Sequence, residues 1–509
     1  MIFMKKITTR LLSLVLLGAF IPSFVLAETW DLGKGDITVT ATETSQTVSQ
    51  VNGETKDDPD PVITSSGKTE NTVTINAETN ATANVTLENV NIDTGTRGGA
   101  AITTSGEGNV NIELNGTNTV QSGNTHAGVE KKDNGTLTIK DEKNNKGSLT
   151  ATGGDRGAGI GGGNDGSGSH ITISGGEVTA KGGRWAAGIG GGEDGNGSNI
   201  AIEGGKVEAS SVGGGAGIGG GSLGSGSNIA VSGGEVTAQG GVGGAGIGGG
   251  QGGSGSNITI SDGKVTATGA GAGAGIGGGY EGSGKSITIE GGEVTAQGDA
   301  GGAGIGGGIS GTGSDVTISG DAQVKVQGGT TGRDWHKGAA IGNGGTPTTD
   351  GNEVPPNTSD LKVGGFIQIY EPGKNINTDT PDRTIEGQKG DHSWNAGEVT
   401  AETVPESKAA AYWVSDSQGQ SIPYQAQQKD GVLTVTVQAD TASLRGTTGS
   451  LSQLEAQGIT GIRFVTNGAQ SAFTLSDLLT SGTGSFTLTH DGDKVTFTLE
   501  STDISGILK

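Results

Sequence analysis

Short segments in which apolar residues alternate with polar residues or glycine follow one another along most of the chain. One such unit holds three apolar pairs, with the members of each pair two positions apart: Ala158 and Ile160, Ile171 and Ile173, and Val178 and Ala180. Alternation with a period of two is typical of a β-strand with one buried face. The unit therefore predicts three short strands separated by glycine-rich corners.

The unit recurs at a constant interval of 29 residues between Gly157 and Gly308. Its first strand carries an isoleucine at the same place in six consecutive copies: Ile160, Ile189, Ile218, Ile247, Ile276 and Ile305. A fixed period of about 20–50 residues is the signature of a solenoid. We therefore predict an all-β parallel β-helix with 29-residue coils, in which residues one unit apart lie directly above one another.

The charges at position 177 and its equivalents support this register independently. Steps of 29 residues from Glu177 lead to residues of alternating sign: Lys206, Glu235, Lys264 and Glu293. Stacked strands place such residues side by side, where opposite charges attract. Duplication of a pair of units would produce the same alternation, so the column favours stacking without proving it.

The regular units lie inside a longer predicted domain. Irregular units with the same alternation precede them, so we expect the β-helix to span residues 73–345, with regular repeats at 157–326. Residues 28–72 are predicted to form an N-terminal cap and the first strands, and residues 346–397 a linker and C-terminal cap. The pattern from 398 to 509 predicts a separate, small β-rich domain with a short helix after Ser450 and a strand over 472–475.

Composition narrows the class of protein. The chain has 105 Gly among 509 residues, no Cys and a formal net charge of −23. The regular phase of Ile and Val argues against disorder, and glycine does not recur at every third position as collagen requires. The acidic balance disfavours nucleic acid and anionic membranes as partners.

The N-terminus predicts a secretory signal peptide over residues 1–27. Lys5, Lys6 and Arg10 are basic, residues 11–24 are mostly apolar, and Val25-Leu26-Ala27 resembles a cleavage site. We expect the mature chain to be secreted, with retention at the cell surface left open, and to carry no transmembrane segment. The absence of Cys means that no disulfide stabilises it.

One acidic corner is a candidate metal site. Asp165 and Asp194 occupy the same position of successive coils, and Glu193 lies beside them. Carboxylates about 5 Å apart on neighbouring coils can share Ca²⁺ through their oxygens. The sequence demands no cofactor, and calcium is an option at this corner; a solvated acidic corner would account for the same residues.

Aromatic residues are candidates for carbohydrate binding because sugar rings stack on their faces. Trp185, Tyr280 and Trp335 are the candidates in the regular array and the insertion that follows it. They do not share one column, so no flat aromatic strip is predicted. A different column holds Asn199, Asn228 and Asn257, for which we expect a structural ladder of side-chain hydrogen bonds.

The repeated phrase Ala-Gly-Ile-Gly-Gly-Gly, followed by Ile-Thr-Ile-Ser-Gly-Gly-Glu-Val-Thr-Ala, resembles repeats of secreted or surface proteins from anaerobic Gram-positive bacteria. More distantly, it is similar to the carbohydrate-binding right-handed β-helix family related to pectate lyases. The resemblance covers about residues 73–345. It implies a right-handed helix that binds polysaccharide with calcium and does not cleave it.

These observations lead to three hypotheses of function. The first is a secreted, non-enzymatic β-helix that binds a polysaccharide, or another host or plant glycan, or acts as an adhesive element at the bacterial surface. The second is a calcium-dependent polysaccharide lyase, but its basic candidates, Arg97, Arg156 and Arg184, are expected on a corner one whole strand away from the acidic residues. The third is a structural spacer without a ligand.

Overall fold

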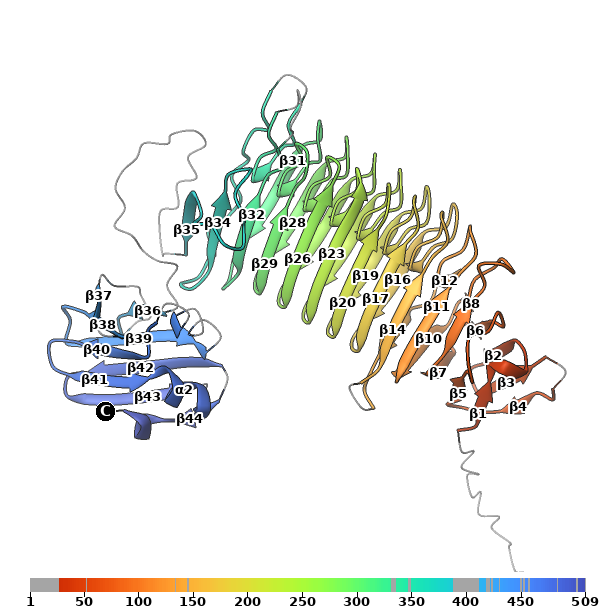
Figure 1. The fold of residues 1–509 in the computed structure, drawn as a ribbon, viewed down its shortest axis with the longest axis horizontal. Helices are drawn as coiled ribbons and strands as arrows, with labels where there is room; N and C mark the ends of the chain where they lie inside the picture. The colour runs from red at the N-terminus through yellow and green to blue at the C-terminus, as the bar shows by residue number, and fades with distance from the viewer. Residues whose placement is uncertain are drawn as a thin grey trace, which may run out of the picture.

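The computed structural model contains a long solenoid and a small C-terminal domain (Figure 1). The predicted signal peptide lies outside the described residues except for Ala27. The structure describes residues 27–51, 53–132, 134–143, 146–330, 336–346, 349–387, 412–417 and, between 422 and 508, all but 423, 430, 449–450, 452–453, 456–457, 483 and 500–501.

Three sheets run along the solenoid, and each regular coil contributes one strand to each of them (Figure 1). Sheet A consists of β1 (Thr29–Asp31), β5 (Val62–Thr64), β7 (Thr82–Glu88), β10 (Asn109–Asn115), β13 (Leu137–Lys140), β16 (Gly168–Ile173), β19 (Gly197–Ile202), β22 (Gly226–Val231), β25 (Gly255–Ile260), β28 (Gly284–Ile289) and β31 (Gly313–Ile318).

Sheet B holds the shortest strands of the regular coils. It consists of β4 (Lys56–Asp57), β3 (Gln46–Gln50), β2 (Ile37–Ala41), β6 (Val73–Ala77), β9 (Ile102–Gly106), β12 (Val129–Lys131), β15 (Ile160–Gly161), β18 (Ile189–Gly190), β21 (Ile218–Gly219), β24 (Ile247–Gly248), β27 (Ile276–Gly277), β30 (Ile305–Gly306) and β33 (Ile341–Gly342).

Sheet C completes each coil. It consists of β8 (Asn91–Asp93), β11 (Thr117–Gln121), β14 (Ser148–Thr152), β17 (Glu177–Gly182), β20 (Lys206–Ser211), β23 (Glu235–Val242), β26 (Lys264–Ala270), β29 (Glu293–Gln297), β32 (Gln323–Gln327), β34 (Phe366–Tyr370) and β35 (Arg383–Glu386). A short 3₁₀ helix, η1 (Leu32–Lys34), follows β1.

The predicted register of 29 residues is confirmed in all three sheets. Ile160 pairs with Ile189 in sheet B, Ile171 with Ile200 in sheet A, and Val178 with Val207 in sheet C. These side chains are buried in one continuous core that extends along the solenoid. The alternating apolar positions therefore stack on themselves from coil to coil.

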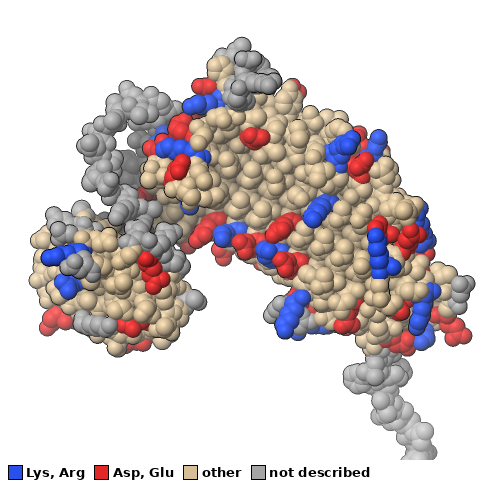
Figure 2. All heavy atoms as spheres, viewed as in Figure 1, with Lys and Arg blue, Asp and Glu red and all other residues tan. Residues whose placement is uncertain are grey.

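The outward columns follow the same register. Lys206 lies 2.9 Å from Glu177, and Lys264 lies 3.6 Å from Glu235. The face shown in Figure 2 is largely uncharged over the coils, with acidic and basic side chains in a row along one edge. The charge column predicted from the sequence is thus part of the stacked structure.

The predicted asparagine ladder is also confirmed. The side-chain amide of Asn228 donates to Asn199 at 3.0 Å, and that of Asn257 donates to Asn228 at 3.1 Å. All three residues have a left-handed backbone, with φ of 51–52°. Asparagine tolerates this conformation better than most residues, which explains its place at this bend.

Both ends of the solenoid are covered. At the start, β3 pairs antiparallel with β2, and the buried Trp30 indole donates to Asp58 at 2.8 Å. At the other end, β35 pairs antiparallel with β34, and both strands lie within residues 346–397, where a linker and C-terminal cap are predicted. The Glu353 carboxylate accepts the backbone N–H groups of Ala340 and Ile341 at 2.8 and 3.2 Å, so it caps sheet B.

The C-terminal domain has a core of its own. One sheet consists of β36 (Tyr412–Ser415), β39 (Thr441–Thr447), β42 (Ser485–Asp491), β43 (Lys494–Leu499) and β44 (Thr502–Asp503), and the other of β37 (Gln425–Lys429), β38 (Val432–Thr436), β40 (Gly461–Val465) and β41 (Gln470–Thr474). A 3₁₀ helix, η2 (Ser505–Ile507), lies near its end.

One boundary predicted in this domain is wrong. The strand expected over 472–475 ends at Thr474, and helix α2 (Leu475–Ser481) begins at the next residue. The Thr474 hydroxyl accepts the N–H of Asp477 at 3.1 Å, and this N-cap starts the helix. Ser450, expected to precede a helix, lies outside the described residues. In the described part of the chain, no helix is both long and apolar enough to cross a membrane.

Candidate functional site

The two corners that flank sheet B lie side by side because its regular strands are only two residues long. The backbone N–H of Ser222 donates to Trp185 O, and that of Tyr280 donates to Gly243 O, both at 2.7 Å. Gln251 makes the same bond, also at 2.7 Å, to Gly214 O. Side chains from the two corners therefore share one surface.

A hollow of about 410 Å³ opens on this surface, and we call it the corner hollow. It extends over several consecutive coils and combines aromatic, polar and acidic side chains. Its lining consists of Trp185, Glu193, Asp194, Ser222, Leu223, Gln251, Gly252, Tyr280 and Glu281.

Glycine in the next coil determines where the Trp185 ring lies. A Cβ atom at Gly214 would be 3.3 Å from Trp185 Cε3, so the indole rests over this glycine. The ring thereby points along the solenoid toward the coil of Tyr280 and keeps 37% of its surface exposed. Any larger residue at position 214 would compete with the ring for this space.

The opposite side of the corner hollow is built in the same way. A Cβ atom at Gly252 would be 3.0 Å from Leu223 Cδ2, so Leu223 lies over the next coil and is 68% exposed. Between the two sides lie Ser222 and Gln251, which occupy equivalent positions of two consecutive coils. The hollow therefore has an apolar wall on each side and polar groups in its floor.

Carboxylates stand at both ends of the corner hollow. Glu193 forms an ion pair with Arg156, with Oε2 3.2 Å from Nη1. At the other end, a hydrogen bond with the Glu281 carboxylate raises the pKa of the Tyr280 hydroxyl. Asp194 and Glu281 are exposed, so their charges face solvent at the rim.

The structure brings together residues that the sequence assigned to two separate sites. Trp185 and Tyr280, expected to bind carbohydrate, and Glu193 and Asp194, expected to bind metal, all line the corner hollow. Asp165 stacks in the column of Asp194, and its N–H donates to Glu193 O at 2.9 Å, but Asp165 does not line the hollow. Trp335 lies outside the described residues.

Sequence reasoning missed several lining residues: Ser222, Leu223, Gln251 and Glu281. The signal that identifies them is the register itself. Steps of 29 residues back from Tyr280 reach Gln251, Ser222 and Glu193, and steps forward from Asp194 reach Leu223, Gly252 and Glu281. Trp185 and Tyr280 lie in different columns, so the site becomes visible only when neighbouring columns are combined.

The separation expected between the basic and acidic corners is wrong. Arg156 was expected one whole strand away from the acidic residues, yet it contacts Glu193. The intervening strand is β15, which has only two residues, and the Glu193 N–H donates to Arg156 O at 3.0 Å. A strand this short does not keep its two corners apart.

The carboxylates do not form a closed metal site by themselves. Across the described residues, no three His, Cys, Asp or Glu side chains are grouped so that they could hold a metal ion. Calcium binding by Asp165, Glu193 and Asp194 stays a prediction. An added ligand that supplies oxygen atoms would be needed to complete the coordination shell.

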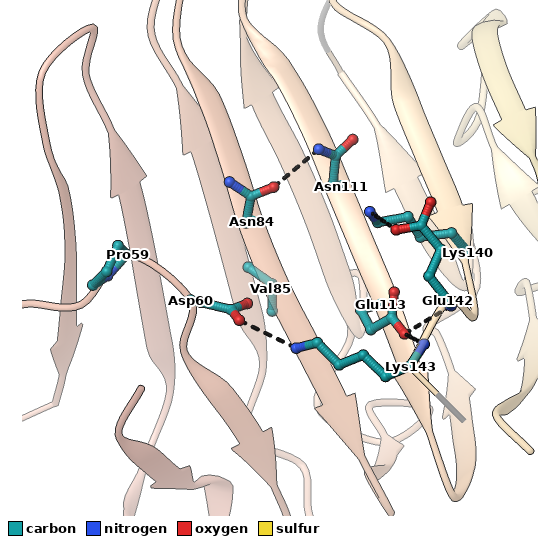
Figure 3. Close-up of a pocket in the computed structure, with 9 residues that line it drawn as sticks. All are labelled: Pro59, Asp60, Asn84, Val85, Asn111, Glu113, Lys140, Glu142 and Lys143. Carbon is teal, nitrogen blue, oxygen red and sulfur yellow. Dashed lines mark hydrogen bonds and ion pairs between the residues drawn. The ribbon is translucent and has the colours of Figure 1, made fainter. Parts of the chain in front are cut away.

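A second hollow, of about 320 Å³, lies on β7, β10 and β13 (Figure 3). Lys143 contacts Asp60 at 3.1 Å, and Asn111 donates to Asn84 at 2.9 Å. The Glu113 carboxylate accepts two backbone N–H groups, from Glu142 and Lys143, at 2.9 and 2.8 Å. Its charged groups are thus already paired with one another or with backbone N–H groups.

Comparison with known proteins agrees with the fold. Searches of curated proteins and of solved structures gave no match to the chain. A family model described as a beta helix repeat matches residues 144–164, 171–193, 200–222, 229–251, 258–280 and 287–309. These segments coincide with the regular coils, including those that form the corner hollow. The regular coils of this solenoid are thus similar to the beta helix repeat.

Proposed function

We propose that this protein is an exported, non-catalytic glycan-binding protein and that the corner hollow is its binding site. The observation that carries the proposal is the position of Trp185 and Tyr280 on one hollow, although 95 residues separate them in the sequence. Ser222 and Gln251, between them, supply hydroxyl and amide groups. Stacking rings beside hydrogen-bonding groups are what sugar recognition requires.

The shape of the corner hollow favours an elongated ligand. Glu193, Ser222, Gln251 and Tyr280 occupy equivalent positions of four consecutive coils. Neighbouring strands lie about 4.8 Å apart, so this row extends for about 14 Å. An oligosaccharide that lies along the solenoid axis would contact the whole row, whereas a compact metabolite would leave part of it empty.

The ion pairs of the arginines support a non-catalytic role. Both terminal nitrogens of Arg97 contact the Asp36 carboxylate at 2.8 Å, and this contact lowers the pKa of Asp36 and raises that of Arg97. Arg156 is paired with Glu193. A guanidinium held by a carboxylate is a poor proton acceptor, which a lyase would need.

The predicted signal peptide over residues 1–27 supports export. The low aromatic content favours the alternative of a spacer without a ligand, so the proposal depends on the few aromatic residues of the corner hollow. The glycan can belong to a plant, a host or the bacterial matrix. In this proposal, the protein is retained at the cell surface by the glycan that it binds there.

Immobilised plant and host polysaccharides test the proposal. We expect the purified protein to be retained, and Trp185→Ala or Tyr280→Ala to weaken binding about tenfold because a stacking contact worth about 1.5 kcal/mol is lost. Val51→Ala, which changes an exposed residue of the N-terminal cap, is the matched control and should bind normally.

The same experiment separates the alternative hypotheses. New unsaturated chain ends would identify a lyase, and absence of retention on every polysaccharide would favour a spacer. A chelator arm tests calcium: loss of binding on chelation, restored by Ca²⁺, would support the predicted acidic site. Equal binding by the Trp185→Ala variant would contradict the assignment of the corner hollow.

A further inference from the structure

We propose that the corner hollow selects glycans that carry free, positively charged amino groups over neutral and anionic glycans. The inference rests on the proposed function and adds the chemical class of the ligand. Three of its lining residues are carboxylates, Glu193, Asp194 and Glu281, and none is Lys or Arg. Its field therefore attracts cations and repels uronate and sulfate groups.

The nearby bases do not cancel this charge. Arg156 pairs with Glu193 and neutralises that one carboxylate. Arg184 precedes Trp185, but a Cβ atom at Gly213 would lie 3.0 Å from Arg184 Cγ, so its side chain extends over Gly213 and outside the lining. Asp194 and Glu281, at the rim, form no ion pair with the basic residues that the structure describes.

These two carboxylates belong to one column, three coils apart. Within the hollow, Asp194 is the first residue of this column and Glu281 the last, with Leu223 and Gly252 between them. At about 4.8 Å per coil, the two charges are separated by about 14 Å along the axis. A chain of amino sugars would place ammonium groups near both ends of the hollow while its rings cover Leu223.

The aromatic residues favour the same ligand. The face of an indole or phenol attracts an ammonium group as well as a sugar ring. Tyr280 lies beside Glu281, and the indole of Trp185 lies between the coils of Glu193 and Tyr280. An aromatic face next to a carboxylate can bind an ammonium group. The same carboxylate would repel a uronate unless a metal ion lay between them.

The test compares oligosaccharides of equal length that differ only in charge. Fully deacetylated β-1,4-glucosamine oligomers, their N-acetylated counterparts and oligogalacturonates are titrated against the full chain by calorimetry at about pH 6, where carboxylates are ionised. We expect the amino form to bind about tenfold more tightly than the N-acetylated form at low salt. This ratio should fall as salt rises, and oligogalacturonate should not bind.

Matched variants identify the groups responsible. Asp194→Asn with Glu281→Gln should abolish the preference, so that the amino and N-acetylated forms bind the variant with equal affinity. Glu235→Gln removes an exposed carboxylate of the charge column, outside the hollow, and should keep the preference. Trp185→Ala should weaken both forms.

The outcomes distinguish this inference from the proposed function. Equal, Trp185-dependent binding of both forms would overturn the charge selection and leave glycan binding intact. Binding of oligogalacturonate only in the presence of Ca²⁺ would overturn it in favour of the metal-bridged mode. Absence of binding to any glycan would overturn both proposals. Polylysine serves as a cation without sugar rings. If it binds as tightly as the amino form, and does so independently of Trp185, the preference reflects general charge attraction and the proposed selection of amino glycans is overturned.

Discussion

At the scale of single residues, glycine determines how closely the coils stack. Gly219 has φ of +136°, and a Cβ atom there would lie 1.9 Å from Gly248 O in the next coil. The same conflict recurs at Gly190 and Gly248. No side chain can be placed at these positions without moving the backbone of a neighbouring coil, which explains the high glycine content.

Gly219→Ala should therefore destabilise the solenoid by about 2 kcal/mol or more, through backbone strain and overpacking. Gly67→Ala is the control because nothing lies within 4 Å of its Cβ position, and it should change stability by less than about 0.5 kcal/mol. Urea denaturation followed by circular dichroism measures both variants. A midpoint for Gly219→Ala equal to that of the wild type would contradict the stacking described here.

The residue scale also shows why part of the site escaped prediction. Trp185 and Tyr280 were recognised because aromatic residues are rare in the coils, and Glu193 and Asp194 because they are acidic. Ser222 and Gln251 carry no such signal by themselves. Their role depends on their position between the aromatic and acidic residues. That position can be predicted only if the two corners are known to touch.

At the scale of elements, the length of each strand decides what the sequence reveals. The strands β16 and β17, in sheets A and C, are each six residues long, so their register could be predicted from Ile171 or Val178. The strand at Ile160 has two residues, and its shortness is visible only in the structure. Helix α2 was missed because Ala472, Phe473 and Leu475 fit a strand until the Thr474 cap is recognised.

The cap of sheet B leads to a pH-dependent prediction. Burial raises the pKa of Glu353 although it accepts the N–H groups of Ala340 and Ile341. A raised pKa means that protonation stabilises the folded state: this contribution is complete below the ordinary pKa of a glutamate and is lost as the pH rises through the folded value.

Glu353→Gln removes this titration. We expect the melting temperature of the wild type, minus that of the variant, to increase as the pH is lowered from about 8 to about 5. Because both proteins share all other carboxylates, the effects of those groups on the melting temperature cancel in the difference. A difference that stays constant, or that decreases toward acid, would show that Glu353 is not desolvated at the cap.

At the scale of the whole molecule, constant register makes complete coils interchangeable. Each coil contacts its neighbours through the same pairs, such as Ile218 with Ile247. In such solenoids stability is approximately the sum of coil and interface contributions. Removal of one full unit should therefore preserve the fold, whereas removal of a partial unit would exchange buried and exposed positions.

Two deletions of 29 residues test this and the site together. Loss of residues 244–272 removes Gln251 and brings Tyr280 one coil closer to Trp185, so the protein should fold and lose at least tenfold in glycan affinity. Loss of residues 284–312 leaves every lining residue in place and should keep the affinity. Circular dichroism checks folding; equal binding by the two proteins would contradict the proposed site.

The covered ends of the solenoid have a consequence for how copies of the molecule behave toward one another. Parallel strands with open edges act as templates onto which further chains add, and fibres result. Here the antiparallel β3 at one end and Glu353 with β35 at the other occupy the groups on which such growth depends. We therefore expect these edges of sheets B and C not to act as templates for further chains at high protein concentration, although a glycine-rich stack of identical ladders would otherwise be prone to such growth.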